Sequence, residues 1–258
     1  NAWLDGPEGL ALDSAGNLYI ATGGGCIRRV DAATGVIRTV AGGGSGGLGD
    51  GGPALAARLG MPLGLVLDAQ ANLYIADYEQ NRIRRVDAAT GLIVTVAGSD
   101  SAGDVPDGVP AVSSGLWLTT DVALDSAGDL YISDSGDHRI RRVDLETGII
   151  TTVAGNGTQG FAGDGGLAVD ASLNFPQSIA IAASGDLYVS DFANHRVRRV
   201  DAVTGVITTI AGSGSREVAG DGGPAVSAGL PFPFGLALDS QGSLYVAEDQ
   251  QHRVRRVE

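Results

Sequence analysis

Lysine is absent from this chain, and cysteine and methionine each occur only once. The single cysteine, Cys26, excludes a framework of intrachain disulfides. No stretch approaches the roughly 18 consecutive apolar residues that a membrane-spanning helix requires, and no charged-then-apolar leader opens the chain. We therefore expect a protein that does not insert into a membrane.

Acidic residues dominate the charge balance. The chain has 17 basic residues, all of them arginine, and 30 acidic residues, which gives a net charge of −13. Such a surface repels nucleic acid and anionic lipid, so neither is expected as a partner. Glycine is abundant, at 41 of 258 residues, and lacks the period of collagen, which indicates many tight turns between short strands.

An internal repeat of about 57 residues organises the whole sequence. A tetrapeptide Leu-Tyr-(Ile/Val)-(Ala/Ser) occurs five times, with its tyrosines at Tyr19, Tyr74, Tyr131, Tyr188 and Tyr245. Each copy is followed by the triplet Arg-Arg-Val. Asp-Gly steps recur 57 residues apart, at Asp50, Asp107, Asp164 and Asp221.

Each copy contains segments that read as short strands, which we call A to D in chain order. In the third copy they are Val122–Leu124, Leu130–Ser133, His138–Val143 and Ile149–Ala154, separated by turns rich in Asp, Ser and Gly. A long Gly-, Asp- and Pro-rich connection leads from strand D to the next strand A. No stretch combines helical periodicity with caps, so α-helix is expected to be nearly absent.

Short antiparallel strands of this kind bury their faces when the repeats stack radially. The predicted fold class is all-β, a five-bladed β-propeller of four-stranded antiparallel blades. The fifth copy stops directly after strand C, so the last blade is expected to lack its outer strand. We expect a single domain over residues 1–258, with repeats at approximately 7–61, 62–118, 119–175, 176–232 and 233–258.

The chain resembles the NHL-repeat β-propeller family, in its bacterial form, over its whole length. The resemblance rests on Gly128–Asp134, Asp137–Val143, Thr147–Gly155 and Gly163–Gly166. It implies the propeller fold. Members of this family serve as protein-binding, nucleic-acid-binding, sensor and occasionally lyase modules, so the resemblance alone implies no single activity.

An acidic residue precedes an arginine by five positions across the B–C turn of four copies. In the first copy Thr22 and Cys26 replace both partners together, which predicts that the acid and the arginine form a structural ion pair. Such a pair contributes about 0–1 kcal/mol where it is exposed. Cys26 is then expected to be a half-buried filler and not a reactive thiol. The pairs are Asp77 with Arg82, Asp134 with Arg139, Asp191 with Arg196 and Glu248 with Arg253.

Two further recurring motifs are predicted to shape turns. His138, His195 and His252 occupy one position of the B–C turn where the second copy has Asn81, and both residue types tolerate unusual φ. Metal binding by these histidines is the alternative, and equivalent positions on neighbouring blades lie too far apart for one shared site. The Asp-Gly steps match neither the EF-hand nor the P-loop spacing, so they are expected to fix a sharp turn in the D–A loop.

Catalytic motifs are lacking. The sequence has no Gly-x-Ser-x-Gly elbow, no His-Glu-x-x-His and no Cys-His pair within sequence reach. We predict no catalytic residue, no cofactor and no metal ligand. Enzymes of this fold assemble sites from several blades around the axis, which sequence spacing does not exclude.

In a four-stranded antiparallel blade with strand A innermost, the B–C turns and D–A loops lie on one side, and the A–B and C–D turns lie on the other. We call the first side the long-loop face, because its connections are longer and more varied. Ligand sites favour variable loops on a rigid scaffold. Trp117 and Phe175, from these loops, are expected to pack beneath them. The candidate ligand-binding residues, at the axial mouth before strand A, are Glu8, Leu63, Thr120, Asp121, Gln177, Ser178 and Phe234.

The sequence thus favours a non-catalytic binding scaffold that recognises a protein, peptide or glycan on the long-loop face, in an extracellular or periplasmic location. The alternative is a metal-dependent lyase or hydrolase with a site at the propeller axis. Because the last blade leaves the edge of its strand C unpaired, we also expect an edge-strand contact with another chain or with flanking residues of a longer protein.

Overall fold

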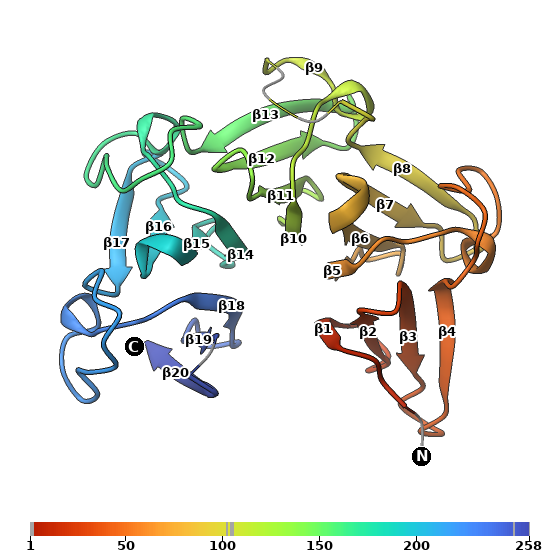
Figure 1. The fold of residues 1–258 in the computed structure, drawn as a ribbon, viewed down its shortest axis with the longest axis horizontal. Coiled ribbons are helices and arrows are strands. Elements are labelled where there is room, and N and C mark those ends of the chain that lie inside the picture. Colours follow the sequence, from red (N-terminus) through yellow and green to blue (C-terminus); the bar gives the residue numbers. More distant parts are fainter. Residues whose placement is uncertain (1–2, 102, 104–105, 250, 258) are drawn as a thin grey trace. The chain divides into compact units, whose positions relative to one another are not determined.

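A computed structural model of the chain describes residues 3–101, 103, 106–249 and 251–257 (Figure 1). It divides into two compact units, Asn1–Leu124 with Val143–Ile150 and Asp125–Arg142 with Thr151–Glu258. The predicted fold class is confirmed, since the strands form five small antiparallel sheets of a five-bladed β-propeller. The chain is 7% helical, and the helical elements of the described residues are all short 3-10 turns.

The first unit contains the sheets of the first two repeats, each with its strands side by side in chain order (Figure 1). The first sheet consists of β1 (Pro7–Leu12), β2 (Leu18–Thr22), β3 (Cys26–Val30) and β4 (Ile37–Gly42). The second consists of β5 (Pro62–Leu67), β6 (Leu73–Asp77), β7 (Arg82–Val86) and β8 (Ile93–Ala97). The remaining elements of this unit are η1 (Ala54–Ala56), η2 (Tyr78–Gln80), β9 (Val109–Pro110), η3 (Ala111–Ser113) and β10 (Thr119–Leu124).

The third repeat continues with β11 (Leu130–Asp134), β12 (Arg139–Asp144) and β13 (Ile149–Ala154). The fourth sheet contains β14 (Pro176–Ile181), β15 (Leu187–Asp191), β16 (Arg196–Val200) and β17 (Ile207–Ala211). The last sheet has three strands within the described residues, as predicted: β18 (Pro233–Leu238), β19 (Leu244–Glu248) and β20 (Arg253–Val257). The 3-10 turns of this region are η4 (Ala168–Asp170), η5 (Phe192–Asn194) and η6 (Ala225–Ser227).

Alternating apolar residues of strands B, C and D form the core between neighbouring sheets. Ile75, Ile83 and Ile93 of the second repeat are completely buried. In the first unit, Leu65 and Ile75 join Ile27 of the preceding sheet and Ala54 of η1 in one apolar cluster. The D–A loop of the first repeat therefore covers part of the interface between the first two sheets and belongs to the packed structure.

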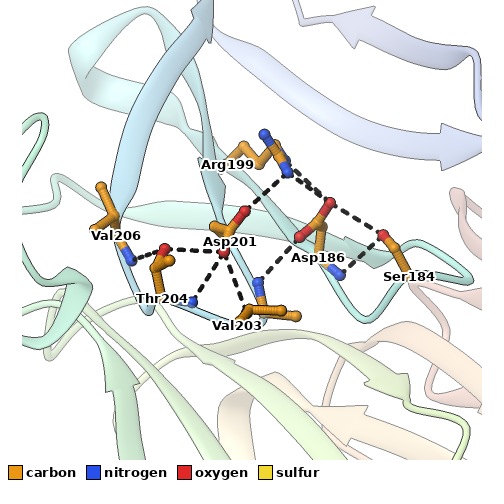
Figure 2. Close-up of polar contacts among 8 residues, drawn as sticks. Ser184, Asp186, Arg199, Asp201, Val203, Thr204 and Val206 are labelled. Atoms are coloured by element: carbon orange, nitrogen blue, oxygen red, sulfur yellow. Dashed lines mark hydrogen bonds and ion pairs between the residues drawn. The ribbon is translucent and has the colours of Figure 1, made fainter.

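The short turns of the fourth repeat form a closed polar network, which Figure 2 shows. In the C–D turn, the Asp201 carboxylate accepts hydrogen bonds from the Thr204 amide (2.9 Å) and hydroxyl (2.9 Å). In the A–B turn, Asp186 accepts from Arg199 (2.8 Å) and from the Ala202 amide (3.0 Å), which ties the two turns together. The Thr204 amide and hydroxyl lower the pKa of Asp201. These turns are internally satisfied and act as a rigid support.

Candidate functional site

In the second to fifth repeats, the first arginine of the Arg-Arg-Val triplet pairs with the acid that ends strand B. Arg84 and Arg198 have completely buried side chains. They lie 3.8 Å from Asp77 and 3.4 Å from Asp191, two carboxylates that are themselves fully buried. Burial raises the pKa of Asp77 to about 7, although the Gly60 amide and Arg84 oppose the rise.

This arrangement corrects the predicted ion pair across the B–C turn in the second and fourth repeats, whereas the predicted pair of Glu248 with Arg253 is present in the fifth. Asp77 and Arg82 are opposite each other in the β6–β7 ladder, but the Arg82 guanidinium binds the Gln80 carbonyl and Asp100. Likewise Arg196 donates to the carbonyls of Asn194 and Ser213. In the fifth repeat Glu248 lies 4.0 Å from Arg253 and 3.7 Å from Arg255. The main partner of the acid is the arginine seven residues on, because that guanidinium is the one enclosed by the neighbouring loop.

The Asp-Gly steps complete this charge cluster. Asp50, in the D–A loop of the first repeat, reaches over the second sheet and binds Arg84 at 2.7 Å and the Thr95 hydroxyl at 2.8 Å. Asp164 binds Arg198 at 2.6 Å and Thr209 at 2.6 Å. The glycine after each of these aspartates has positive φ, so the predicted sharp turn is confirmed. The ionic role was not predicted; a constant separation of 34 residues between Asp and Arg was the signal for it.

The buried acids fix the long loops in place. One oxygen of Asp77 accepts the Gly60 amide at 2.7 Å, and Asp191 accepts the Asn174 amide at 2.7 Å. Gly60 and Asn174 belong to D–A loops, whereas the acids end strand B just before the B–C turn. Each acid therefore joins the two kinds of loop that form the candidate binding surface.

The histidine position of the B–C turn has the predicted turn role. Asn81, His138 and His195 have φ of 51°, 53° and 55°, in the left-handed region. The Asn81 side-chain oxygen accepts the Leu118 amide at 2.7 Å, and His138 Nδ1 accepts the Phe175 amide at 3.2 Å. Each side chain thus holds the residue before the next strand A. This bond requires a neutral imidazole, and burial, with Arg139 nearby, lowers the pKa of His138.

Replacing His138 with Asn is expected to reduce the loss of stability in acid. Because the folded-state pKa of His138 is depressed, the unfolded chain binds the proton more readily, and stability falls as pH drops below the ordinary histidine pKa of about 6.5. Asn keeps the turn and an acceptor, as Asn81 does, so we expect a change within about 1 kcal/mol at pH 8. Thermal unfolding of both proteins between pH 8 and pH 5 tests this. His252→Asn, at an exposed turn, is the control, and parallel pH profiles for His138→Asn and the parent would contradict the prediction.

Most of the candidate ligand-binding residues lie at β-bulges where strand A begins. The ladders shift register between Pro7 and Leu10, between Pro62 and Leu65, between Pro176 and Ile179 and between Pro233 and Leu236. Bulges re-aim side chains and are common beside functional sites. The candidates within these bulges are Glu8, Leu63, Gln177, Ser178 and Phe234.

In the first unit the candidate residues come close together. A Cβ on Gly9 would clash with the Leu63 carbonyl, and one on Gly64 would lie 2.5 Å from the Asp121 Cα. Glu8 is exposed and Leu63 and Asp121 are half-buried, whereas Thr120 is buried. Thr120 therefore belongs to the support of this surface more than to its contact area.

In the second unit the candidates separate into support and surface. Ser178 is buried, and its hydroxyl accepts the Leu236 amide at 3.1 Å, which joins β14 to β18. Gln177 is half-buried and donates to the Ser135 hydroxyl at 3.2 Å. Phe234 is 39% exposed, and its ring centroid lies 6.2 Å from that of Phe192, which also packs against Phe232. These three phenylalanines form an aromatic cluster between a B–C turn and a D–A loop.

The two aromatic residues expected beneath the loops differ. Phe175 is half-buried with its ring centroid 4.7 Å from that of His138, in an edge-on contact. Trp117 is 45% exposed, so its predicted burial is wrong. Cys26 is half-buried, as expected, with its thiol 3.8 Å from the Gly24 carbonyl.

A pocket of about 330 Å³ opens between the B–C turn of the first repeat and the D–A loop that follows it. The B–C turn contributes Gly23, Gly24 and Gly25, which have no side chains to fill the space. Arg58 and Glu79 place opposite charges on the rim, and both side chains are exposed. The remaining lining residues are Leu59, Gly60 and Met61, directly before Pro62 and Leu63 of β5.

Within the described residues, no three His, Cys, Asp or Glu side chains are grouped so as to hold a metal ion. In the same part of the chain, no helix is long and apolar enough to span a bilayer.

Three family models match parts of the chain. The NHL repeat matches residues 120–143, the teneurin NHL domain residues 156–219, and the strictosidine synthase-like N-terminal model residues 4–30. Among curated proteins, Suppressor of Quenching 1 of Arabidopsis thaliana is 27% identical over 100% of the chain, and mouse teneurin-4 is 32% identical over 76% of it. The chain spans 25% and 8% of the length of these two relatives.

Solved structures share the fold at low identity. A nidogen/laminin complex matches with a TM-score of 0.67 and 17% identity over 97% of this chain and 74% of the other. An auxiliary nutrient binding protein from Bacteroides ovatus matches with a TM-score of 0.61 and 19% identity over 99% of this chain and 69% of the other. Virginiamycin B lyase from Staphylococcus aureus matches with a TM-score of 0.58 and 15% identity over 97% of this chain and 69% of the other. The NHL-repeat and teneurin NHL-domain models, the repeated motifs and the blade structure together show that the chain belongs to the NHL-repeat β-propeller family.

Proposed function

We propose that this chain is a non-catalytic binding module that recognises a protein, peptide or glycan on its long-loop face. The observation that carries the proposal is the pocket at Leu59–Met61, with the glycine turn Gly23–Gly25 on one side and Arg58 and Glu79 on its rim. A concave site with apolar walls and a few charged groups is the usual form of a small ligand site or of an anchor pocket for a larger partner.

The rigidity of the surrounding loops supports this proposal. The pocket wall at Gly60 is held by the buried carboxylate of Asp77, and the Gly60 carbonyl accepts the Glu79 amide at 3.1 Å. A wall fixed in this way loses little entropy when a ligand binds. The aromatic cluster around Phe234 offers a second contact area of the same loop type, and the exposed ring of Phe234 is of a kind enriched at binding surfaces.

The comparisons agree with a binding role and an extracellular or periplasmic location. One structural neighbour is a nidogen/laminin complex, others are auxiliary nutrient binding proteins, and one is the extracellular domain of a putative one component system from B. thetaiotaomicron. A net charge of −13 supports a partner that is not nucleic acid.

Binding should depend on the pocket rim and not on the short turns. The full chain is screened on a glycan array and a displayed-peptide library, and the dissociation constant of each hit is measured. Arg58→Ala with Glu79→Ala is expected to weaken at least one hit about tenfold, as removal of a central contact does. Val203→Ala, on a C–D turn where the side chain is 93% exposed, is the matched control and should change nothing. A hit whose affinity drops only with Val203→Ala would contradict the assignment.

A metal-dependent lyase or hydrolase is the competing function, since a lyase shares the fold. Elemental analysis of the purified chain separates the two proposals. Stoichiometric zinc or calcium that survives dialysis would favour the enzyme, and its absence with a bound glycan or peptide would favour the binding module.

A further inference from the structure

The pocket at Leu59–Met61 lies where other repeats have a hydrogen-bonding side chain. In the second, third and fourth repeats, the last residue of the B–C turn accepts the amide of the residue before the next strand A. These acceptors are Asn81 for Leu118, His138 for Phe175 and His195 for Phe232, at 2.7, 3.2 and 3.1 Å. The first repeat has Gly25 at this position and Met61 before strand A, so the acceptor is missing there.

The B–C turn of the first repeat otherwise keeps the shape of the others. Gly25 has φ of 73°, in the left-handed region, as Asn81 has with 51°. The Gly25 carbonyl lies against Gly42, as the Asn81 carbonyl lies against Gly98. A Cβ on Gly25 would lie 2.6 Å from the Leu59 carbonyl oxygen, so a side chain fits here only if the loop moves. This turn therefore cannot supply the missing acceptor.

The Met61 N–H is the donor that this leaves unmatched. Met61 has φ of 49°, close to the 53° of Leu118, so its peptide group takes the same orientation. Within the described residues the Met61 N–H has no hydrogen-bond partner. A backbone N–H is a strong donor that native structures almost always satisfy. We therefore expect an oxygen from outside the chain to bind here.

Two charged side chains at the pocket are also unpaired. Arg58 and Glu79 are exposed, and within the part of the chain that the structure describes neither side chain makes a hydrogen bond or an ion pair. The Glu79 Oε2 lies 3.1 Å from the position of a Cβ on Gly60, next to Met61 in the chain. The arginine is peculiar to this loop, since the next three D–A loops have Gly115, Ser172 and Gly229 at its position. The pocket thus offers a guanidinium and an N–H to an anion, and a carboxylate to a donor.

We propose that this pocket binds the C-terminal carboxylate of a peptide, an inference that rests on the binding role proposed above and narrows its ligand. One carboxylate oxygen accepts the Met61 N–H, and the other forms a charge-assisted bond with Arg58. The last peptide N–H of the ligand donates to Glu79. An apolar terminal side chain packs against the Met61 side chain, which is 37% exposed. Capture of a terminal carboxylate by backbone N–H groups is a recurring mode of peptide recognition.

The charge of the molecule favours a peptide over an acidic glycan. A peptide brings one terminal carboxylate, whereas an acidic polysaccharide brings many and is repelled by a net charge of −13. Asp5 adds a negative charge beside the glycine turn, with its Oδ2 3.3 Å from the position of a Cβ on Gly24. Basic residues upstream of the terminal residue should therefore strengthen binding.

Peptides that differ only at their last group test the proposal. The full chain is screened against a library of N-acetylated hexapeptides with free C-termini, and each hit is resynthesised with a terminal carboxamide. In calorimetric titrations the carboxamide form should bind at least about tenfold more weakly, because it lacks the charge that pairs with Arg58. Binding of the carboxylate form should also slow hydrogen exchange of the Met61 amide.

Arg58→Gln tests the same contact from the side of the protein, since Arg58 is exposed and unpaired in the free chain. It should weaken the carboxylate peptide about tenfold and leave the carboxamide peptide within about twofold. Arg38→Gln is the matched control. It removes the same charge at an exposed position of β4 outside the pocket, and both peptides should bind within about twofold of the parent.

The outcomes separate this inference from the proposed function. Equal affinities for carboxylate and carboxamide, both lowered by Arg58→Ala with Glu79→Ala, would overturn the C-terminal assignment and keep the pocket as a binding site. Binding confined to carboxylate-bearing glycans, or no saturable peptide binding at millimolar concentration, would overturn the assignment as well. Peptides that leave Met61 exchange unchanged and respond to neither Arg58→Gln nor the double variant would overturn both the assignment and the proposed role of the pocket.

Discussion

Replacing Arg84 with methionine is expected to lower the free energy of unfolding by about 3–5 kcal/mol, the usual cost of removing one partner from a buried ion pair. The side chains of Arg84 and Asp77 are both completely buried, so the variant leaves a carboxylate in an apolar site without its cation. The Gly60 amide is then its main remaining partner. Loss of Arg84 also raises the pKa of Asp77 further, since the guanidinium acts to lower it.

Arg85 provides a matched control within the same triplet. Its side chain is 30% exposed and lies 3.3 Å from Asp87. Arg85→Met should therefore cost no more than about 1 kcal/mol. Urea unfolding of both variants measures the difference. The double variant Arg84→Met with Asp77→Asn should recover about 1–2 kcal/mol relative to Arg84→Met, because the amide still accepts the Gly60 N–H without a charge. Equal losses for Arg84→Met and Arg85→Met would contradict the assignment of the buried cation.

Replacing Gly64 with alanine is expected to cost about 1–3 kcal/mol, the range for overpacking a close contact. A Cβ there would lie 2.5 Å from the Asp121 Cα, and a backbone atom of β10 cannot swing aside as a flexible side chain can. The innermost strands β5 and β10 would separate, and the bulge that presents Leu63 would move with them.

Gly46, in the D–A loop of the first repeat, supplies the control within the same unit. A Cβ there meets no other atom within 4 Å. Gly46→Ala should therefore lie within about 0.5 kcal/mol of the parent or stabilise it slightly, because alanine loses less backbone entropy on folding. Thermal unfolding of the two variants under one set of conditions tests the contrast. Comparable losses at both positions would show that strand spacing is not set at Gly64.

The repeated pattern predicted most of the fold because each copy carries the same alternation. The segment Leu130–Ser133 was predicted as strand B and lies within β11, and His138–Val143 agrees with β12 to within one residue. The strands could be predicted since one apolar face per strand is buried in every copy. Whether residues 1–258 act as a single domain remains a prediction.

The candidate site was predicted only in part, for reasons that lie in packing. Asp77 has arginines at two later positions that can face it, and which guanidinium is enclosed depends on a loop from the preceding repeat. Ser178 was chosen for its position and proved to be a buried link between strands. The pocket at Leu59–Met61 is lined by none of the predicted candidates; it exists because three glycines leave space, and missing side chains give no signal in a motif search.

The reach of Asp50 to Arg84 has a consequence for how such a chain can grow by duplication. A copied segment that starts at strand A brings a buried guanidinium without the carboxylate that neutralises it, because that carboxylate belongs to the segment before. A segment that runs from Asp50 to just before Asp107 contains both charges, the threonine that joins them and a complete set of strands A to D. The segment that can be duplicated as a unit therefore begins at the Asp-Gly step and does not coincide with one blade, which begins at strand A. Insertions or deletions should be tolerated best immediately before the Asp-Gly step.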